Sequence, residues 1–322
     1  MRFFLGIDGG GSKCDAVVID EAGSVRGWGK AGATGYTSEQ QAEQACHQAL
    51  AEALGELSVR EVEMATLWIR NCATAWLEAR GIVVHRHLVS EWDCSFAAAD
   101  RSWGVAVHAG TGSWVNGRTE DGRQVHMGGM GPFVGDDGGG WDIGLRGIKA
   151  ALRSRWSQRI HTSLAEAVPQ ALGVADLGKA VIGLPITSGQ ITRGQVASVA
   201  PAVIQEAAAG DRIARDILEA AAAELAELCG LVLDELDIVG QGYPLIGIAG
   251  VIQGSPLYWE ILLGKILEYD ATLVPEVPAV RMVVAAAMLA MQSAGLRVTE
   301  QIRERILATQ TAFPAARVVT QS

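Results

Sequence analysis

The sequence predicts an α/β protein with two domains, and three observations indicate this class. The chain has 322 residues, which is long for a single hydrophobic core. Hydrophobic residues make up 49% of it, with many alanines and 39 glycines, a composition that suits tight packing. Short apolar runs that end in glycine turns alternate with alanine-rich stretches of helical periodicity, as in proteins that alternate strands and helices.

The first part of the chain is expected to begin with three strands. The apolar runs at residues 3–8, 14–20 and 24–31 are separated by glycine-containing turns. A helix is expected over residues 38–54, where alanines recur on one face. Further elements follow in order: a strand at 64–69, a short helix at 72–80, a strand at 81–89, and a helix of small residues that Asp93 opens.

A second hairpin set begins at Trp103, with strands on both sides of a glycine turn at 110–112 and a further strand at 123–129. The segments GIDGGGSK and HAGTGSWV share one plan, in which an apolar strand, a glycine turn with a hydroxyl and another strand follow each other. The sequence thus suggests a weak internal duplication with a period of about a hundred residues.

Beyond Gly131 the pattern becomes mainly helical. The predicted elements are helices at 141–156, 177–184, 195–209 and 211–236, a buried strand at 244–251, and helices after Ser255 and at 280–294. The residues after Val298 are polar and are expected to fray beyond Phe313.

Charge and cysteine content exclude several function classes. The net charge of −10 argues against a nucleic-acid or anionic-membrane surface. The five cysteines are scattered without a CxxC pair, so neither a zinc knuckle nor a disulfide framework is expected. The N-terminus has no cationic segment followed by a long apolar stretch, and residues 280–291 are too few to span a bilayer. We therefore expect a cytoplasmic protein.

The glycine turn near the N-terminus is the most informative motif. An apolar strand ends in Asp8, and Gly9, Gly10, Gly11, Ser12 and Lys13 precede a second strand. Glycines let the backbone approach an anion closely, and a carboxylate at a strand end suits a metal ion bound through water. Because a strand rather than a helix follows, a Walker A loop and a dinucleotide fingerprint are excluded. The motif predicts a phosphate and magnesium site, and an ordinary glycine-rich hairpin is the alternative.

Three further signals lie downstream. Gly110, Thr111, Gly112 and Ser113 form a second candidate phosphate loop, for which a plain hairpin is the alternative. Asp93 stands at a helix start between the two loops, where it fits either a general base or a helix N-cap, with Glu91 as a nearby competitor for the base. The glycine-rich run 128–140 contains Asp136 and Asp137, which suit sugar hydroxyls, metal-bound water or a helix cap. Finally, Gly247–Val251 is a strand ending in small residues, which suits an adenine ring.

These signals, in this order, resemble the actin/hexokinase/Hsp70-like phosphotransferase superfamily. More narrowly, they resemble the BadF/BadG/BcrA/BcrD ATPase family, which contains N-acetylglucosamine and glucosamine kinases. Residues 135–152 and 196–226 also resemble that family along their length. The resemblance covers about residues 3–292 and implies two ribonuclease-H-like domains flanking a nucleotide cleft, at residues 1–109 and 110–322.

The resemblance also implies roles for single residues. It implies ATP and Mg²⁺ as cofactors, a small-molecule sugar as substrate, and a homodimer. It implies Asp8 at the metal and Asp93 as catalytic base; nucleotide contacts from Gly9, Gly10, Gly11, Ser12, Lys13, Gly110, Thr111, Gly112, Ser113, Ala249, Gly250 and Val251; and sugar contacts from Asp93, Gly112, Gly129, Asp136 and Asp137.

Two alternatives to a sugar kinase stay open at this stage. One is an ATPase that acts as a conformational activator of a dehydratase-type partner through an iron–sulfur cluster. Cluster binding needs well-placed cysteines, and none lies beside the second loop. The other is a nucleotide-binding regulator without catalysis, against which the presence of both Asp8 and Asp93 argues.

Overall fold

The computed structural model describes residues 1–67, 71–181 and 192–313. The chain forms two compact units, which we call the terminal unit (Met1–Arg101 with Ala279–Ser322) and the middle unit (Ser102–Pro278). The sequence prediction placed one boundary between residues 109 and 110. The observed division instead lies between Arg101 and Ser102, and the last segment of the chain returns to the first unit.

The terminal unit is built on a five-stranded sheet of order β3-β2-β1-β4-β5. Its strands are β1 (Phe3–Gly9), β2 (Cys14–Asp20), β3 (Val25–Ala31), β4 (Glu61–Leu67) and β5 (Val83–Leu88). β1, β2 and β3 pair antiparallel, whereas β4 joins β1 and β5 joins β4 in parallel. The predicted strands are confirmed, and residues 68 and 69 of the predicted fourth strand lie outside the described residues.

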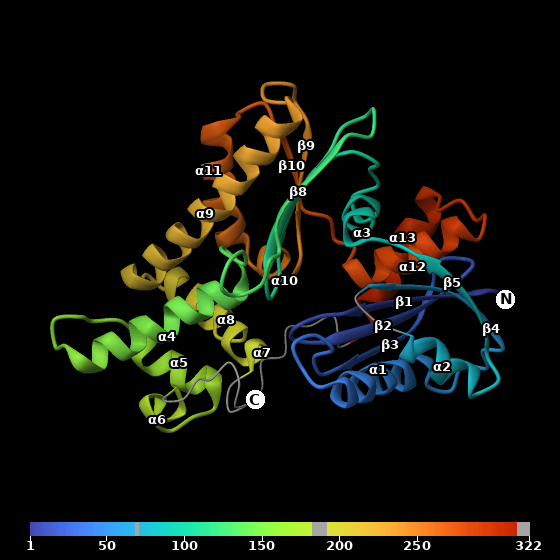
Figure 1. Cartoon of the computed structure of the whole chain (residues 1–322), viewed down its shortest axis with the longest axis horizontal. Helices are drawn as coiled ribbons and strands as arrows, with labels where there is room; N and C mark the ends of the chain where they lie inside the picture. The colour runs from blue at the N-terminus through green and yellow to red at the C-terminus, as the bar shows by residue number, and fades with distance from the viewer. Residues whose placement is uncertain (68–70, 182–191, 314–322) are drawn as a thin grey trace. The chain divides into compact units, whose positions relative to one another are not determined.

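Helices cover both faces of this sheet (Figure 1). Helix α1 (Glu39–Leu54) packs on β3 so closely that a Cβ on Gly27 would lie 1.8 Å from the Ala53 carbonyl oxygen. On the opposite face, a Cβ on Gly6 would lie 2.1 Å from the Val283 carbonyl oxygen of α12 (Met282–Ser293). The glycines therefore allow backbone-to-backbone packing that any side chain would prevent. The remaining helices of the unit are α2 (Cys72–Glu78), α3 (Glu91–Ala98) and α13 (Glu300–Gln310).

Helix α13 lies in the polar segment after Val298, where no helix was predicted. Thr299 caps it by accepting the Ile302 N–H, and Ile306 is fully buried. Arg303 donates to the carbonyl oxygens of Ala97 and Ala98 at 2.9 and 2.8 Å, where α3 ends. A cation at a helix C-terminus satisfies the last carbonyls, and this contact docks α13 on α3. The fraying predicted beyond Phe313 concerns residues outside the described ranges.

The middle unit repeats the sheet topology of the terminal unit. Its sheet has the order β10-β9-β6-β7-β8, with β6 (Gly104–Ala109), β7 (Ser113–Arg118), β8 (Gln124–Gly128), β9 (Pro244–Ile248) and β10 (Val274–Glu276). Antiparallel pairing of the first three strands and parallel pairing of the last two recur in the same places. The weak duplication suspected from the two glycine hairpins therefore corresponds to a repeated fold.

Helices of the middle unit pack on its sheet around one large apolar core. They are α4 (Gly140–Trp156), α5 (Leu164–Leu172), α6 (Leu177–Val181), α7 (Arg193–Ala197), α8 (Ala200–Ala208), α9 (Arg212–Leu236), α10 (Gly250–Gly254) and α11 (Pro256–Tyr269). The single helix predicted at 195–209 is in fact two, because Pro201 starts a new helix and disfavours helical backbone before it. Helix α5 and strand β10 were not predicted, and residues 182–184 of the predicted helix at 177–184 lie outside the described ranges.

Candidate active site

The first phosphate loop is a tight turn between β1 and β2. The Gly10 N–H donates to the Lys13 carbonyl at 2.8 Å, and the Gly10 carbonyl accepts the N–H groups of Thr34 and Gly35, each at 3.0 Å. Both backbone groups of Gly10 are thus used within the protein and hold the turn against the segment after β3. Gly11 and Ser12, at the tip of the turn, keep partial contact with solvent. The turn joins two antiparallel strands, as both interpretations of the glycines require, and phosphate and magnesium binding at the turn stay predictions.

Asp8 lies opposite Asp15 across the two strands. Asp15 is buried, forms an ion pair with Lys13, and accepts from the Trp28 Nε1 at 3.3 Å. Asp8 keeps partial solvent contact, yet burial raises the pKa of its carboxyl to about 6; the Lys13 charge lowers this pKa and the Asp15 charge raises it further. An ionised Asp8 therefore lacks full charge compensation, which is the condition in which a carboxylate favours a cation.

Asp93 belongs to the first turn of α3, but it is not the N-cap. Ser90 is the N-cap, and its Oγ accepts the Asp93 N–H at 3.0 Å while donating to Asp93 Oδ2 at 2.6 Å. Together they form a capping box, which corrects the N-cap alternative weighed from the sequence. Asp93 takes part in helix capping from the third helical position.

The structure brings Asp8 and Asp93 into one neighbourhood of the terminal unit. Both carboxylates act on the thiol of Cys94, which is fully buried. Desolvation raises the pKa of this thiol, and the charges of Asp8, Asp93 and Glu91, in that order, raise it further. A carboxylate at the end of a strand and one in the first turn of a helix therefore lie near the same buried side chain.

The second loop, Gly110–Gly112, connects β6 to β7 and meets the start of α4. The N–H of Gly140 donates to the Gly110 carbonyl at 2.8 Å, and the N–H of Trp141 donates to the Thr111 carbonyl at 2.9 Å. The first N–H groups of a helix have no partner within it, so the loop satisfies them. Ser113 lies inside, with its Oγ donating to the Asp137 carbonyl at 2.6 Å.

Asp136 lies deep in the middle unit, where it pairs with Arg193. Its Oδ2 accepts from the Arg193 guanidinium and its Oδ1 from the Ser113 N–H at 3.4 Å. Only 4% of Asp136 is exposed, and desolvation raises the pKa of its carboxyl against the lowering effect of Arg193. Asp136 thus anchors the glycine-rich loop, whereas the side chain of Asp137 is exposed and open to a ligand.

Two of the predicted nucleotide motifs meet within the middle unit. A Cβ on Gly110 would lie 3.5 Å from the Ala249 Cβ, and one on Gly140 would lie 3.4 Å from Val251 Cγ2. Ala249 has φ = 76° where β9 passes into α10, a conformation uncommon outside glycine that tends to mark functional positions. The predicted second phosphate loop and the predicted adenosine segment are therefore adjacent.

An aromatic stack that the sequence did not indicate lies beside these loops. The rings of His108 and Trp114 are parallel with centroids 4.6 Å apart, and His126 lies 5.6 Å from Trp114 on its other side. A Cβ on Gly110 would lie 2.9 Å from His108 Cε1, and one on Gly129 would lie 3.6 Å from His126 Nε2. Desolvation lowers the pKa of His108 to about 4 and also lowers that of His126. The stack is therefore neutral at physiological pH and supports both glycine loops.

Three of the five cysteines converge, although they are scattered along the sequence. The Cys46 thiol is hydrogen-bonded with those of Cys14 and Cys72, and the three lie in the core between β2, α1 and α2. The contact with Cys14, with desolvation adding to it, raises the pKa of Cys46 to about 12, although the contact with Cys72 lowers it. The contact with Cys46 raises the pKa of Cys72. Among the described residues, no group of His, Cys, Asp or Glu is arranged to hold a metal ion on its own.

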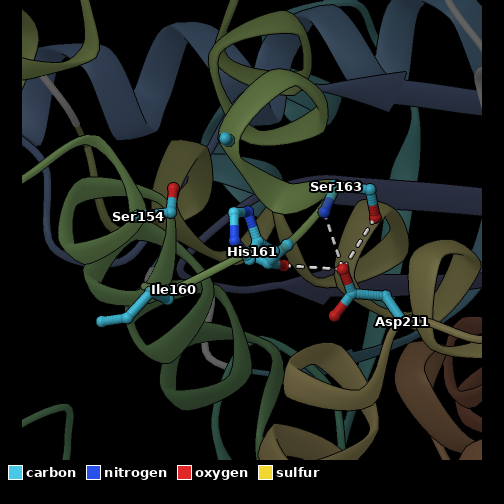
Figure 2. A pocket seen from close by; sticks show the side chains of 7 residues that line it. Ser154, Ile160, His161, Ser163 and Asp211 are labelled. Carbon is cyan, nitrogen blue, oxygen red and sulfur yellow. Dashed lines mark hydrogen bonds between the residues drawn. The ribbon is translucent and has the colours of Figure 1, made fainter. Parts of the chain in front are cut away.

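A cavity of about 540 Å³ lies at the start of α9, away from the predicted site residues (Figure 2). Its polar centre is the Asp211 carboxylate, whose Oδ2 accepts from Thr162 Oγ1 at 2.7 Å and from the N–H and Oγ of Ser163 at 2.7 and 3.0 Å. Its Oδ1 accepts the Ala214 N–H at 2.9 Å. These bonds cap α9 and tie it to the segment before α5. Helix capping therefore accounts for the polar groups that line the cavity.

Two α/β units with the same sheet topology, each with a glycine turn between its first two strands, give the chain a fold of the actin-like ATPase type. A model of the BadF/BadG/BcrA/BcrD ATPase family matches residues 5–290. The chain belongs to that family.

Relatives and solved structures agree with this assignment. An N-acetyl-D-glucosamine kinase of Dictyostelium discoideum is 25% identical over 83% of this chain and 91% of the relative. An N-acetylmuramic acid/N-acetylglucosamine kinase of Clostridium acetobutylicum is 29% identical over 48% of this chain, which spans 55% of that relative. A structure from Chromobacterium violaceum, provisionally assigned as an N-acetylglucosamine kinase, has a TM-score of 0.64 at 22% identity, covering 90% of this chain and 99% of its own. None of the described helices is long and apolar enough to cross a membrane.

Proposed function

We propose that this protein is an ATP-dependent kinase of an amino sugar of the N-acetylglucosamine or glucosamine type. The observation that carries the proposal is the neighbourhood of Asp8 and Asp93, whose carboxylates both act on the buried Cys94 thiol. The kinase names of the relatives support the substrate class. A homodimer and a cytoplasmic location remain predictions from the sequence.

In this mechanism Asp93 is the general base. Its carboxylate accepts the proton of the attacking sugar hydroxyl as the oxygen forms its bond to the γ-phosphorus, and ADP leaves. Backbone N–H groups of the two glycine turns hold the phosphates, since positioning and electrostatics account for most of the catalysis of phosphoryl transfer. Asp137 and Gly129 are proposed to contact the sugar, and the Gly110–Ala249 junction to contact the adenosine.

The residues present fit a magnesium ion. Magnesium is commonly held by one or two carboxylates together with substrate phosphates and water, and Asp8 offers one carboxylate whose charge is incompletely compensated. Asp8 would hold the ion through its water shell. The ion would neutralise charge on the β- and γ-phosphates.

The cysteines do not fit the activator alternative. An iron–sulfur cluster shared between subunits needs cysteines at an accessible surface. Cys14, Cys46, Cys94 and Cys229 are buried, and only Cys72 is partly exposed.

The test is ADP release over a panel of amino sugars and neutral hexoses, with a no-sugar control. We expect sugar-dependent turnover that Asp93→Asn reduces by at least about a hundredfold, the usual scale of a general base. The amide can still accept from Ser90, so the fold should persist. Glu91→Gln, in the same helical turn, is the matched control and should keep near-normal activity.

Other outcomes would redirect the assignment. Loss of activity in Glu91→Gln but not in Asp93→Asn would indicate that Glu91 is the general base. ATP hydrolysis at the same rate with and without every sugar would favour the activator class. Nucleotide binding without any turnover would favour a regulator.

A further inference from the structure

A groove of about 460 Å³ lies between helices α4 and α9 of the middle unit, and side chains of these two helices line it. The α4 wall carries Arg146, Lys149 and Arg153, whose spacing of three and four residues places them on one helix face. Asp216 lies on the α9 wall, and the buried Ile217 adds apolar surface. The groove therefore combines charges of both signs with an apolar lining.

One of these cations is already fully engaged within the protein. Arg146 donates through Nε to Asp142 Oδ1 at 2.7 Å, and through Nη2 to the two carboxylate oxygens of Glu224 at 2.8 and 2.9 Å. The other oxygen of Asp142 accepts the Gly138 N–H at 3.1 Å. The carboxylates of Asp142 and Glu224 therefore balance Arg146, and Asp142 ties the groove wall to the glycine-rich loop.

Three charges of the lining are left without a partner. Among the residues that the structure describes, the side chains of Lys149, Arg153 and Asp216 form no ion pair and no hydrogen bond. A basic residue in the last turn of a helix stabilises the helix dipole, which would explain Arg153 alone. It does not explain an unpaired carboxylate on the opposite wall. The unpaired charge of the groove is thus two positive and one negative.

We propose that this groove binds a small zwitterion that carries two negative charges and one positive charge. Lys149 and Arg153 would each bind an anionic oxygen, Asp216 would bind an ammonium group, and the carbon skeleton would lie on Ala150 and Ile217. An acidic amino acid and the phosphate ester of an amino sugar share this chemistry, and the experiment distinguishes the two sources. The inference goes beyond the proposed function, in which none of these residues contacts sugar or nucleotide.

The test is calorimetric binding of L-glutamate and of glucosamine 6-phosphate to the full-length protein at low ionic strength, where charge interactions are least screened. We expect at least one of them to bind. Lys149→Met and Arg153→Met should each weaken that ligand by about tenfold, the scale of one hydrogen bond to a charged group. Arg155→Met is the matched control, because Arg155 lies on the same helix, pairs with Asp176 at 3.6 Å and does not line the groove. It should bind the ligand as the unmodified protein does.

The role of Asp216 has its own comparison. N-acetyl-L-glutamate and N-acetylglucosamine 6-phosphate lack the ammonium group, so each should bind more weakly than its parent compound. Asp216→Asn should abolish this difference. The substituted side chains of Lys149, Arg153 and Asp216 are exposed, so the fold should persist in all three variants.

Two results would overturn the inference. One is the absence of binding by both L-glutamate and glucosamine 6-phosphate. The other is binding that Lys149→Met and Arg153→Met leave unchanged, since a ligand held at the proposed sugar site does not need these side chains. Sugar-dependent turnover plays no part in this test, so its absence would count against the proposed function alone.

Discussion

Asp8 shows how a single carboxylate can cost stability and serve a ligand. Its pKa in the folded protein is about 6, above the unfolded value of 3.8, chiefly because burial disfavours the charged form. A folded state that binds the proton more tightly loses stability as pH rises between these two values. Above pH 6 the full cost is present, and a bound cation offsets it.

Asp8→Asn should therefore stabilise the protein while abolishing turnover. Without nucleotide or magnesium, we expect the free energy of unfolding at pH 7 to increase by on the order of 2 kcal/mol, and the gain to shrink toward zero near pH 4. Turnover should vanish, since a neutral amide holds the water shell of magnesium poorly. Urea unfolding at both pH values checks this. Asp216→Asn, at an exposed position of α9, should change stability by less than about 0.5 kcal/mol. A destabilised Asp8→Asn protein at pH 7 would contradict the argument.

Among the elements, the loop between β6 and β7 is fixed by contacts that admit no side chain. A Cβ on Gly112 would lie 2.3 Å from Asp136 Oδ1 and 2.7 Å from Arg193 Nη2. The loop thus packs directly on a buried ion pair whose partners lie 57 residues apart. Any added atom must push this pair apart or displace the loop.

Gly112→Ala should lower the free energy of unfolding by about 1–3 kcal/mol, the usual cost of overpacking, and weaken MgATP binding. Gly264→Ala is the control, because a Cβ in the middle of α11 would have nothing within 4 Å. It should raise stability by roughly 0.5–1 kcal/mol through helix propensity. Thermal unfolding and nucleotide titration of both variants check this. A Gly112→Ala protein with unchanged stability and unchanged MgATP affinity would show that the loop can accommodate the methyl group.

Local signals explain which elements could be predicted from the sequence. The strands around the glycine turns and helix α9 were predictable because turns and periodic apolar residues are encoded by neighbours in sequence. Helix α13 was missed because its buried positions among the described residues are only Ile306 and Gln310, too few to show a period. The break before Pro201 does have a local signal, because proline disfavours helical backbone at the residue before it.

The candidate site follows the same rule. The glycine loops and Asp93 were predicted because each lies within a short motif, and the resemblance to a family supplied their grouping. Arg193 and Asp15 were not predicted, because their importance depends on their partners. Arg193 meets Asp136 only through tertiary folding. Asp15 is held by Lys13 and Trp28. The cysteines show the converse, being scattered in sequence yet in contact in the core.

At the scale of the whole molecule, the chain leaves the terminal unit after Arg101 and returns to it at Ala279. The returning helix α12 packs on β1, β4 and α3, and β1 carries Gly6 to receive it. The middle unit, in contrast, has a core made entirely from one continuous segment.

A fragment of residues 102–278 should therefore fold alone, with a cooperative thermal transition followed by circular dichroism. Residues 1–101 alone should not, because the sheet face that α12 covers would be exposed. Joining residues 279–313 to residues 1–101 through a flexible linker should restore cooperative unfolding. Cooperative folding of the 1–101 fragment by itself would show that the returning segment is dispensable.

The same chain path sets an order of events during biosynthesis. Residues 1–101 leave the ribosome well before the helix that covers their sheet, because that helix is encoded after Pro278. At about 5–20 residues per second, the nascent terminal unit waits on the order of ten seconds or more with an apolar sheet face uncovered. The middle unit can complete its core during that interval. A cell making this protein must therefore shield residues 1–101 until α12 is made, and we expect general chaperones to associate with nascent chains that end before α12.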